Sequence, residues 1–461
     1  MTHRVTFIRG ARAIEVEVAV VLIALLLGLS ATPRTVHAGT ITAGDPTTTS
    51  ADPKAVVFKL TVQAPSGLQS ATLDYKLFNP DTTVGGSQQA EVNGSTATEV
   101  TVTLTTNSNE RYIPVGSNFK YTWTLVDKDG TRVVTPERSF VFLDGRYQWQ
   151  EKTTGNFTVY WYGDNVRNAD LALQAAAAST ADNEKLLNVK LTYPIRLVVW
   201  RRESEGEAAQ QSRGGSFDRQ VVTGGARVAP DVVHLYDPIG GFVDVVRHEI
   251  AHIVTKVAGD GPFGRLPSWI DEGTAVFAQT DPGGYRFALQ SAIQSDNLTR
   301  LRAMASPANQ ANKVDIFYGQ SWATVKYMVD KHGQPKFVDL YKTFRASGDM
   351  DGALKQVYGF DQDGLYNEWR QSVGLKPIEF PPESSTGSPQ AQGTRAPLGI
   401  GVPGAGGTSS QGAGGDGATT PATESGSKTL PAIIVGLATL AVAAGMGFGA
   451  FRLLKKPKTQ A

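Results

Sequence analysis

The sequence predicts a multidomain protein in which a β-sandwich precedes an α+β domain, followed by a disordered stalk and one transmembrane helix. Three observations support this prediction. Short β-rich segments recur through residues 39–147, strand patterns give way to helical periodicity within residues 148–375, and an uncharged apolar stretch occurs near the C-terminus. The length of 461 residues also exceeds that of one typical domain, about 100–200 residues.

Composition excludes several kinds of site. Lys and Arg total 44 and Asp and Glu total 43, for a net charge of +1. This balance provides no general attraction to polyanions, so we expect no nucleic-acid partner. The chain has no Cys, which excludes disulfides, thiolate zinc sites and a cysteine nucleophile. A metal ion would therefore be held by carboxylates and by some of the 6 His.

Residues 1–38 predict a secretory signal peptide. Arginines precede an apolar run over residues 18–29, and residues 36–38 place small side chains where signal peptidase recognises them. Glu15 and Glu17 are unusual beside such a run, so an uncleaved N-terminal anchor is the alternative. Both interpretations export the residues that follow.

Residues 39–147 predict an all-β domain. Asp129-Gly130 predicts a tight turn toward the last strand of this region. The β-rich segments are 55–62, 71–78, 99–104, 119–126 and 139–142. Their number and spacing are typical of an immunoglobulin-like sandwich. No residue here suggests chemistry, so we expect a spacer, a clamp on the neighbouring domain or a binding module.

Residues 148–375 predict an α+β domain. Strands are expected at 157–162, 195–200 and 232–236, and an Ala-rich helix at 169–189. Further helices are expected at about 242–258, 267–280, 285–294, 317–332, 335–345, 350–357 and 361–373. A small sheet followed by a helical half is typical of this fold class.

The first of these later helices contains an H-E-x-x-H motif, from His248 to His252. Positions i and i+4 share one helix face, so both imidazoles can reach one ion at about 2.0–2.1 Å. Glu249 lies one step round the helix, where it can act as a general base on water. The alternative is a helix with two ordinary histidines and a surface glutamate.

A second segment offers a third ligand. Catalytic zinc takes three protein ligands and keeps one position for water. Asp271-Glu272-Gly273-Thr274-Ala275 follows the motif, and with it the chain resembles the gluzincin metallopeptidases, the clan of thermolysin and alanyl aminopeptidase. The resemblance implies that one Zn²⁺ is held by the two histidines and Glu272, and that the domain hydrolyses peptide bonds.

The resemblance extends beyond the ligands. In aminopeptidase-like members a tyrosine at the start of a later helix donates a hydrogen bond to the oxyanion, which implies this role for Tyr318. A tyrosine that only packs at the helix start is the alternative. Residues 155–373 resemble bacterial peptidase MA-like domains, with Gly224-Gly225 and Trp369 at matching positions.

The sequence departs from the clan in two places. Thermolysin relatives carry an Asp four residues after the third ligand, but position 276 is Val. An acid that orients a ligand histidine must then come from elsewhere, and Asp271 and Asp244 are candidates. The Gly-x-Met-Glu-Asn motif that holds a free amine in true aminopeptidases is also absent, which favours internal cleavage.

The C-terminal region predicts a membrane anchor. Residues 376–428 are rich in Gly, Ser, Thr and Pro, which is typical of a disordered stalk. Residues 429–454 contain an uncharged stretch long enough to cross a hydrocarbon core of about 30 Å. The basic tail, 455–461, should stay in the cytoplasm. We therefore expect a single-pass protein of the cell membrane with an extracytoplasmic catalytic domain.

Taken together, these features predict a membrane-anchored zinc peptidase that acts on peptides or proteins. One alternative is a catalytically inactive peptidase-fold binding or scaffold protein of the cell envelope, but the intact Glu249 argues against it. Another is a protein whose β domain is the working part and whose zinc is structural. A structural site needs four protein ligands, and no fourth is evident. Nothing in the sequence indicates an oligomeric state.

Overall fold

The computed structural model describes residues 40–80, 82–108, 111–210, 224–236, 241–306 and 313–380. The predicted signal peptide, the stalk beyond residue 380, the predicted transmembrane segment and the basic tail lie outside these residues. Within them, no helix has both the length and the apolar character needed to span a membrane.

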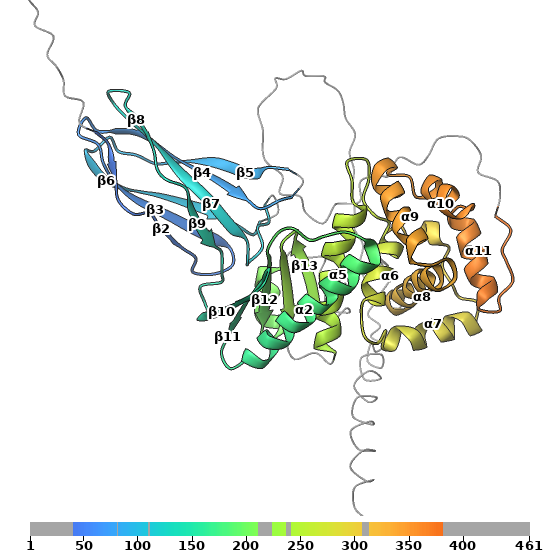
Figure 1. The fold of residues 1–461 in the computed structure, drawn as a ribbon. Coiled ribbons are helices and arrows are strands. Elements are labelled where there is room, and N and C mark those ends of the chain that lie inside the picture. Colours follow the sequence, from blue (N-terminus) through green and yellow to red (C-terminus); the bar gives the residue numbers. More distant parts are fainter. Residues whose placement is uncertain are drawn as a thin grey trace, which may run out of the picture. The chain divides into compact units, whose positions relative to one another are not determined.

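The N-terminal part is a sandwich of two antiparallel sheets, which confirms the predicted sheet-rich region (Figure 1). Its strands are β1 (Thr42–Ala43), β2 (Thr47–Thr49), β3 (Ala55–Gln63), β4 (Leu68–Leu77), β5 (Val84–Ala90), β6 (Ala97–Thr105), β7 (Asn118–Asp127), β8 (Arg132–Val134) and β9 (Arg138–Val141). In the first sheet β3 pairs with β1, β2 and β6; in the second the order is β5-β4-β7-β8, with β9 also on β7.

Alternation places one row of each of the long strands β3, β4, β6 and β7 in the core between the two sheets. Phe58 of β3 contacts Phe119 and Tyr121 of β7, with ring centroids 5.7 and 5.0 Å apart. The turn at Asp129-Gly130 leads first into the short β8, which the sequence did not predict, and only then to β9. Gly130 has a φ of +83° there, a conformation that favours glycine.

A third sheet, of mixed parallel and antiparallel strands, has the order β10-β11-β12-β14-β13. Its strands are β10 (Trp149–Thr154), β11 (Phe157–Tyr162), β12 (Ile195–Trp200), β13 (Gly225–Ala229) and β14 (Val232–Tyr236). The central β11, β12 and β14 are parallel and coincide with the three predicted strands. Their near-continuous apolar sequences suit strands that are covered on both faces. The antiparallel edge strands β10 and β13 carry few large apolar residues, so the sequence did not predict them.

Different parts of the chain cover the two faces of this sheet. On one face Val159, Leu197 and Val233 pack with α2 (Val166–Leu187) and α5 (Phe242–Gly259) (Figure 1). On the other, Val198 and Trp200 join the apolar core of the sandwich. The sandwich and the sheet therefore share one core.

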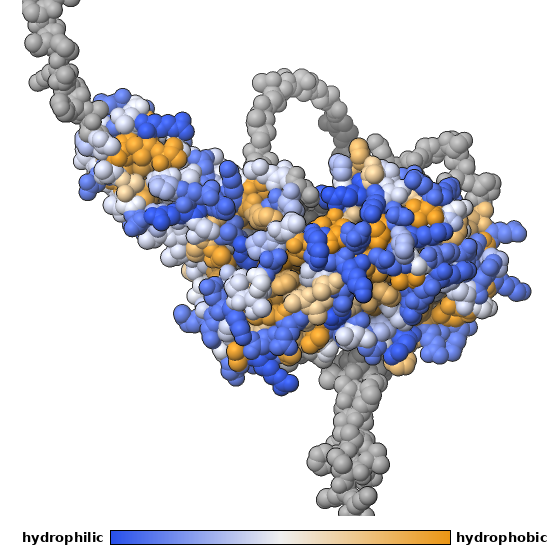
Figure 2. Space-filling view, in the orientation of Figure 1, coloured by the Kyte–Doolittle hydropathy of each residue, from blue (hydrophilic) through white to orange (hydrophobic). Residues whose placement is uncertain are grey.

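The remainder is helical, as predicted. It contains α6 (Ser268–Phe277), α7 (Gly284–Gln294), α8 (Val314–His332), α9 (Gln334–Ser347), α10 (Met350–Tyr358) and α11 (Gln362–Ser372). Glycines in the left-handed conformation end two of them: Gly348 after α9 and Gly359 after α10. Trp269 and Trp369 are buried in the core that these helices share. On the face drawn in Figure 2, hydrophobic residues lie in small groups among hydrophilic ones.

Candidate metal centre

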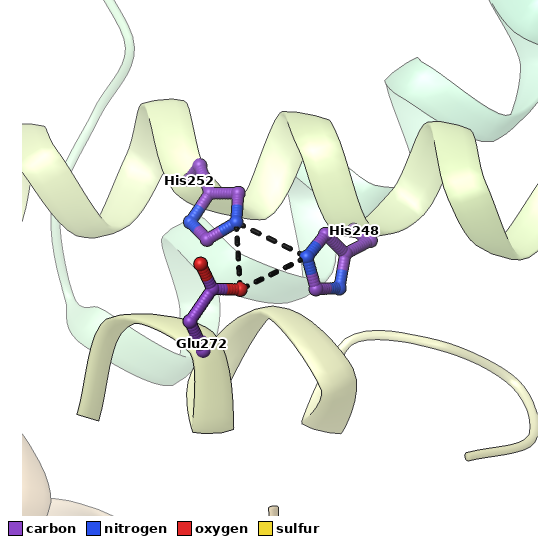
Figure 3. Close-up of side chains that lie close together, drawn as sticks. All are labelled: His248, His252 and Glu272. Atoms are coloured by element: carbon purple, nitrogen blue, oxygen red, sulfur yellow. Dashed lines mark hydrogen bonds and ion pairs between the residues drawn. The ribbon is translucent and has the colours of Figure 1, made fainter. Parts of the chain in front are cut away.

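Helix α5 carries the H-E-x-x-H motif, and its packing fixes which side the motif faces. Val246, Ile250 and Ile253 are buried in the core between α5 and the mixed sheet. His248 and His252 lie on the side that faces α6, which carries Glu272 (Figure 3). Gly273, beside Glu272, packs so closely on α8 that an added Cβ would clash with the Ser321 carbonyl oxygen. The glycine of the D-E-G-x-A segment therefore lets α6 approach α8.

Three side-chain atoms converge at this point (Figure 3). His248 Nε2 lies 3.1 Å from His252 Nε2, and Glu272 Oε2 lies 3.2 Å from each of them. A tetrahedral ion with ligands at about 2.0–2.1 Å would hold its ligand atoms about 3.3–3.4 Å apart. Glu272 Oε2 is buried and has no hydrogen-bond partner within the described part of the chain. The donor set and its spacing therefore fit a divalent cation such as zinc.

The electrostatics of the site favour an ionised third ligand. Burial alone would raise the pKa of Glu272, but the adjacent His252 and His248 outweigh it and lower the pKa to about 2. Burial would likewise lower the pKa of His252, but the carboxylates of Asp271 and Glu272 raise it well above its ordinary value. Both shifts have one cause, the attraction between carboxylates and a charged imidazole, so a bound cation would take the place of the proton that these carboxylates stabilise on His252.

Asp271 lies beside His252, where one of the two proposals from the sequence expects an orienting acid. Its Oδ1 lies 3.2 Å from His252 Nδ1. Thr255 Oγ1 donates a hydrogen bond to Oδ1 and Lys256 Nζ donates to Oδ2, each at 2.5 Å. A carboxylate on Nδ1 keeps the ring proton there and leaves Nε2 for a metal ion.

Asp244 does not orient either imidazole, so the other proposal is wrong. Its Oδ1 accepts hydrogen bonds from the backbone N and the Oγ1 of Thr280, both at 2.7 Å. His248 Nδ1 instead lies 3.0 Å from Nε2 of Gln279. Gln279 was not among the residues predicted from the sequence, although its position seven residues after Glu272 would have placed it on the same side of a continuing helix.

Glu249, the predicted general base, lies against the edge strand β13. Its Oε2 accepts a hydrogen bond of 2.8 Å from the backbone N–H of Arg227. Gly225 lies so close that an added Cβ would be 3.0 Å from Glu249 Cγ. This contact gives a physical reason for a glycine at this edge, and it fixes one oxygen of the carboxylate.

Two tyrosines adjoin the histidines. The ring of Tyr318 on α8 lies 6.0 Å from that of His248, and Tyr285 on α7 stacks on Tyr318 at 5.0 Å. Burial, helped by the nearby Asp315, Glu272 and Glu249, raises the pKa of Tyr285 to about 12. Tyr285 therefore keeps its proton at neutral pH. Tyr285 was not predicted from the sequence, because no local pattern connects α7 with the motif.

A comparison with protein families supports a peptidase-type domain in this part of the chain. Residues 237–374, which include α5 to α11, match the family model of the Peptidase MA superfamily. The matched region contains His248, Glu249, His252, Glu272 and Tyr318. A comparison with curated proteins gives no match.

Solved structures show only distant likeness. An aminopeptidase N family protein from Idiomarina loihiensis is 9% identical, with 74% of this chain and 77% of that chain covered and a TM-score of 0.34. OgpA from Akkermansia muciniphila is 10% identical, with 22% and 27% covered and a TM-score of 0.19. A human fibronectin III domain is 12% identical, with 25% and 86% covered and a TM-score of 0.15. Likeness at this level carries no argument about function.

Proposed function

We propose that this chain is a zinc-dependent peptidase with one Zn²⁺ held by His248, His252 and Glu272. The observation that carries the proposal is the convergence of two Nε2 atoms and one buried carboxylate oxygen within 3.2 Å of one another. Three protein ligands leave a position for water, which is typical of catalytic rather than structural zinc. The match of this region to a peptidase superfamily supports the same reading.

The residues around the ligands have complementary roles in peptide hydrolysis. When bound, zinc would polarise the scissile carbonyl and make water more acidic. Glu249 accepts the proton of the attacking water and passes it to the leaving amine. Because its Oε2 accepts the Arg227 N–H, Oε1 is the oxygen that we expect to take the proton. Tyr318, beside His248, donates a hydrogen bond to the oxyanion.

The edge strand β13 supports internal cleavage. As far as the described residues extend, β13 pairs only with β14 and lies at the edge of its sheet. Its Arg227 N–H points away from β14, toward Glu249. An extended peptide bound along such an edge can continue past the site in both directions. Cleavage within a chain is therefore favoured over removal of terminal residues.

The proposed site of action is outside the cytoplasmic membrane. This part of the proposal depends on the sequence alone: the signal peptide of residues 1–38 and the apolar segment of residues 429–454. Membrane fractionation of cells that express the full-length chain or a chain ending at residue 428 tests it. Equal release of both proteins into the soluble fraction would contradict the proposed anchor.

The substitution Glu249→Gln tests the catalytic role directly. Loss of the general base should lower cleavage of a mixed peptide library by about 10²–10⁴-fold, while the zinc content remains unchanged because Glu249 is not a ligand. Glu99→Gln, on the exposed surface of the sandwich, is the matched control. If the wild-type protein holds zinc and cleaves nothing, the inactive binding protein becomes the better interpretation.

A further inference from the structure

The short segment after α6 is attached to α5 at two residues, one on each side of Gln279. Arg247 Nε donates a hydrogen bond of 2.6 Å to the Ala278 carbonyl oxygen. Asp244 accepts two hydrogen bonds from Thr280, both at 2.7 Å. The residue between them, Gln279, is therefore held at both sides by the helix that carries the two histidines.

The first of these attachments is itself supported. The Arg247 guanidinium also donates to Asp182 of α2, at 2.6 Å. Ser179, one turn earlier in α2, donates a hydrogen bond of 2.7 Å to the Arg247 carbonyl oxygen. Arg247 thus has partners on α2 as well as on the segment after α6, so little conformational freedom remains to be lost when Gln279 contacts His248.

We propose that Gln279 is the positioning residue for His248: it sets the orientation of the ring and the location of its proton so that Nε2 faces the metal site. This inference rests on the proposed function of the site. It explains how the chain functions with Val276 where thermolysin relatives carry an Asp. Val276 is buried in the structure, and the amide of Gln279 reaches His248 Nδ1 at 3.0 Å.

The chemistry of an amide suits this role. A neutral imidazole binds a metal ion through Nε2 only when its proton is on Nδ1, and that proton needs an acceptor. A glutamine side chain carries both a donor and an acceptor. The Gln279 nitrogen faces Nδ1 in the structure, and a half-turn of the amide presents its oxygen to an Nδ1–H. A carboxylate could only accept.

The two ligand histidines are consequently held by different groups. His252 has the carboxylate of Asp271 at 3.2 Å, whereas His248 has a neutral amide. A neutral partner adds no further negative charge to a site that already contains Glu272 and Asp271. Since an Nδ1 proton can be accepted by an amide oxygen or by a carboxylate, metal affinity should depend on the presence of an acceptor at position 279 more than on its charge.

Zinc affinity of the full-length protein, measured by competition with a chromophoric chelator, tests the inference. Gln279→Met fills similar space without an acceptor and should weaken zinc binding by about 10–100-fold. Gln279→Glu keeps an acceptor at the same reach and should bind zinc at least as tightly as the wild type. Gln279→Asn keeps the amide but shortens its reach, and should behave like the Met variant.

Gln290→Met, on the exposed face of α7, is the control for the loss of a glutamine. Thermal unfolding of the zinc-free variants separates positioning from folding, since we expect all of them to unfold within about 2 °C of the wild type. Wild-type affinity in both Gln279→Met and Gln279→Asn would overturn the inference. A loss of zinc affinity in Gln279→Glu as large as that in Gln279→Met would also overturn it, because an acceptor at position 279 would then fail to restore binding.

These outcomes are distinct from failure of the proposed function. A wild-type protein that binds zinc and cleaves no peptide would overturn the peptidase assignment and leave the role of Gln279 measurable by affinity. If the wild-type protein cleaves peptides and the substitutions at position 279 leave zinc affinity unchanged, the peptidase assignment stands and the role of Gln279 is overturned. A wild-type protein that binds no zinc would overturn both.

Discussion

At the scale of single residues, Tyr318 and Tyr285 have roles that can be tested separately, one as a hydrogen-bond donor and the other as a packing ring. The ring of Tyr318 lies against His248, and the ring of Tyr285 stacks on that of Tyr318. A hydroxyl that stabilises the oxyanion acts through its O–H, whereas a ring that only supports its neighbour acts through its shape. Removing each hydroxyl while keeping the ring distinguishes these two roles.

We therefore expect Tyr318→Phe to lower kcat by about 10²–10³-fold with an unchanged zinc content. Tyr285→Phe should lower kcat by less than about threefold, because its ring still stacks on Tyr318. Steady-state kinetics on a peptide cleaved by the wild type measures both. If the larger loss falls on Tyr285→Phe, then Tyr285 and not Tyr318 is the oxyanion donor.

The residues of the site differ in how far the sequence could predict them. His248, Glu249 and His252 follow from the geometry of one helix turn, so their juxtaposition could be expected from spacing alone. Glu272 came from resemblance, and the structure brings it to the same point. The Arg227 N–H and Gln279 contact the site only because β13 and the end of α6 pack on α5. The contact with Arg227 joins separate elements and leaves no local pattern in the sequence, whereas the spacing of Gln279 from Glu272 was a signal that could have been used.

At the scale of elements, the packing of α6 on α8 sets how far Glu272 lies from Tyr318. Glu272 is on α6 and Tyr318 is on α8, and Gly273 lies where the two helices touch. Gly319 has the same function between α8 and α7, where an added Cβ would clash with the Tyr285 carbonyl oxygen. Both glycines are inside helices, where glycine is unfavourable by about 1 kcal/mol relative to alanine. Close packing offsets that cost.

Gly273→Ala should therefore destabilise the protein, although alanine is the better helix former. The steric clash with Ser321 should lower the free energy of unfolding by about 1–3 kcal/mol, as overpacked cores usually do. Gly284→Ala is the matched control, since Gly284 is also helical and an added Cβ there meets no atom within 4 Å. Urea unfolding of both variants gives the comparison. A stabilised Gly273→Ala would show that the contact is not tight.

The elements themselves were predictable where one periodicity dominates. The central strands are almost continuously apolar, and apolar residues recur every three to four positions in the later helices. Both kinds of element could therefore be located from the sequence. The strands β1, β2, β5, β8, β10 and β13 have no such signature. They exist because a neighbouring strand supplies hydrogen-bond partners, which is a property of the assembled sheet.

At the scale of the whole molecule, the sandwich and the mixed sheet depend on each other. Gly116 of the sandwich lies so close to the sheet that an added Cβ would be 2.7 Å from Val232 and 2.8 Å from Val198. Tyr112 donates a hydrogen bond of 2.9 Å to the Ala209 carbonyl oxygen across the same junction. Among the three roles expected for the β domain, these contacts favour the clamp on its neighbour.

His234 lies at this junction and makes its stability depend on pH. The imidazole of His234, in β14, contacts the Val115 carbonyl oxygen of the sandwich at 2.8 Å through Nε2. Complete burial lowers its pKa from 6.5 to about 4, despite the opposing effect of that hydrogen bond. Between these two values the unfolded chain binds a proton that the folded protein does not. The stabilisation of the folded protein by neutral His234 is thus complete above about pH 6.5 and is lost as the pH falls toward 4.

The expected size of this effect follows from the shift in pKa. At about 1.4 kcal/mol per unit, the wild type should lose about 3 kcal/mol of unfolding free energy through His234 between pH 7 and pH 4. His234→Gln keeps a donor for Val115 but cannot titrate, so its stability should fall correspondingly less. Urea unfolding of both proteins across this range isolates the contribution, because all other titrating groups are common to them. Parallel curves would mean that His234 is not held neutral at the junction.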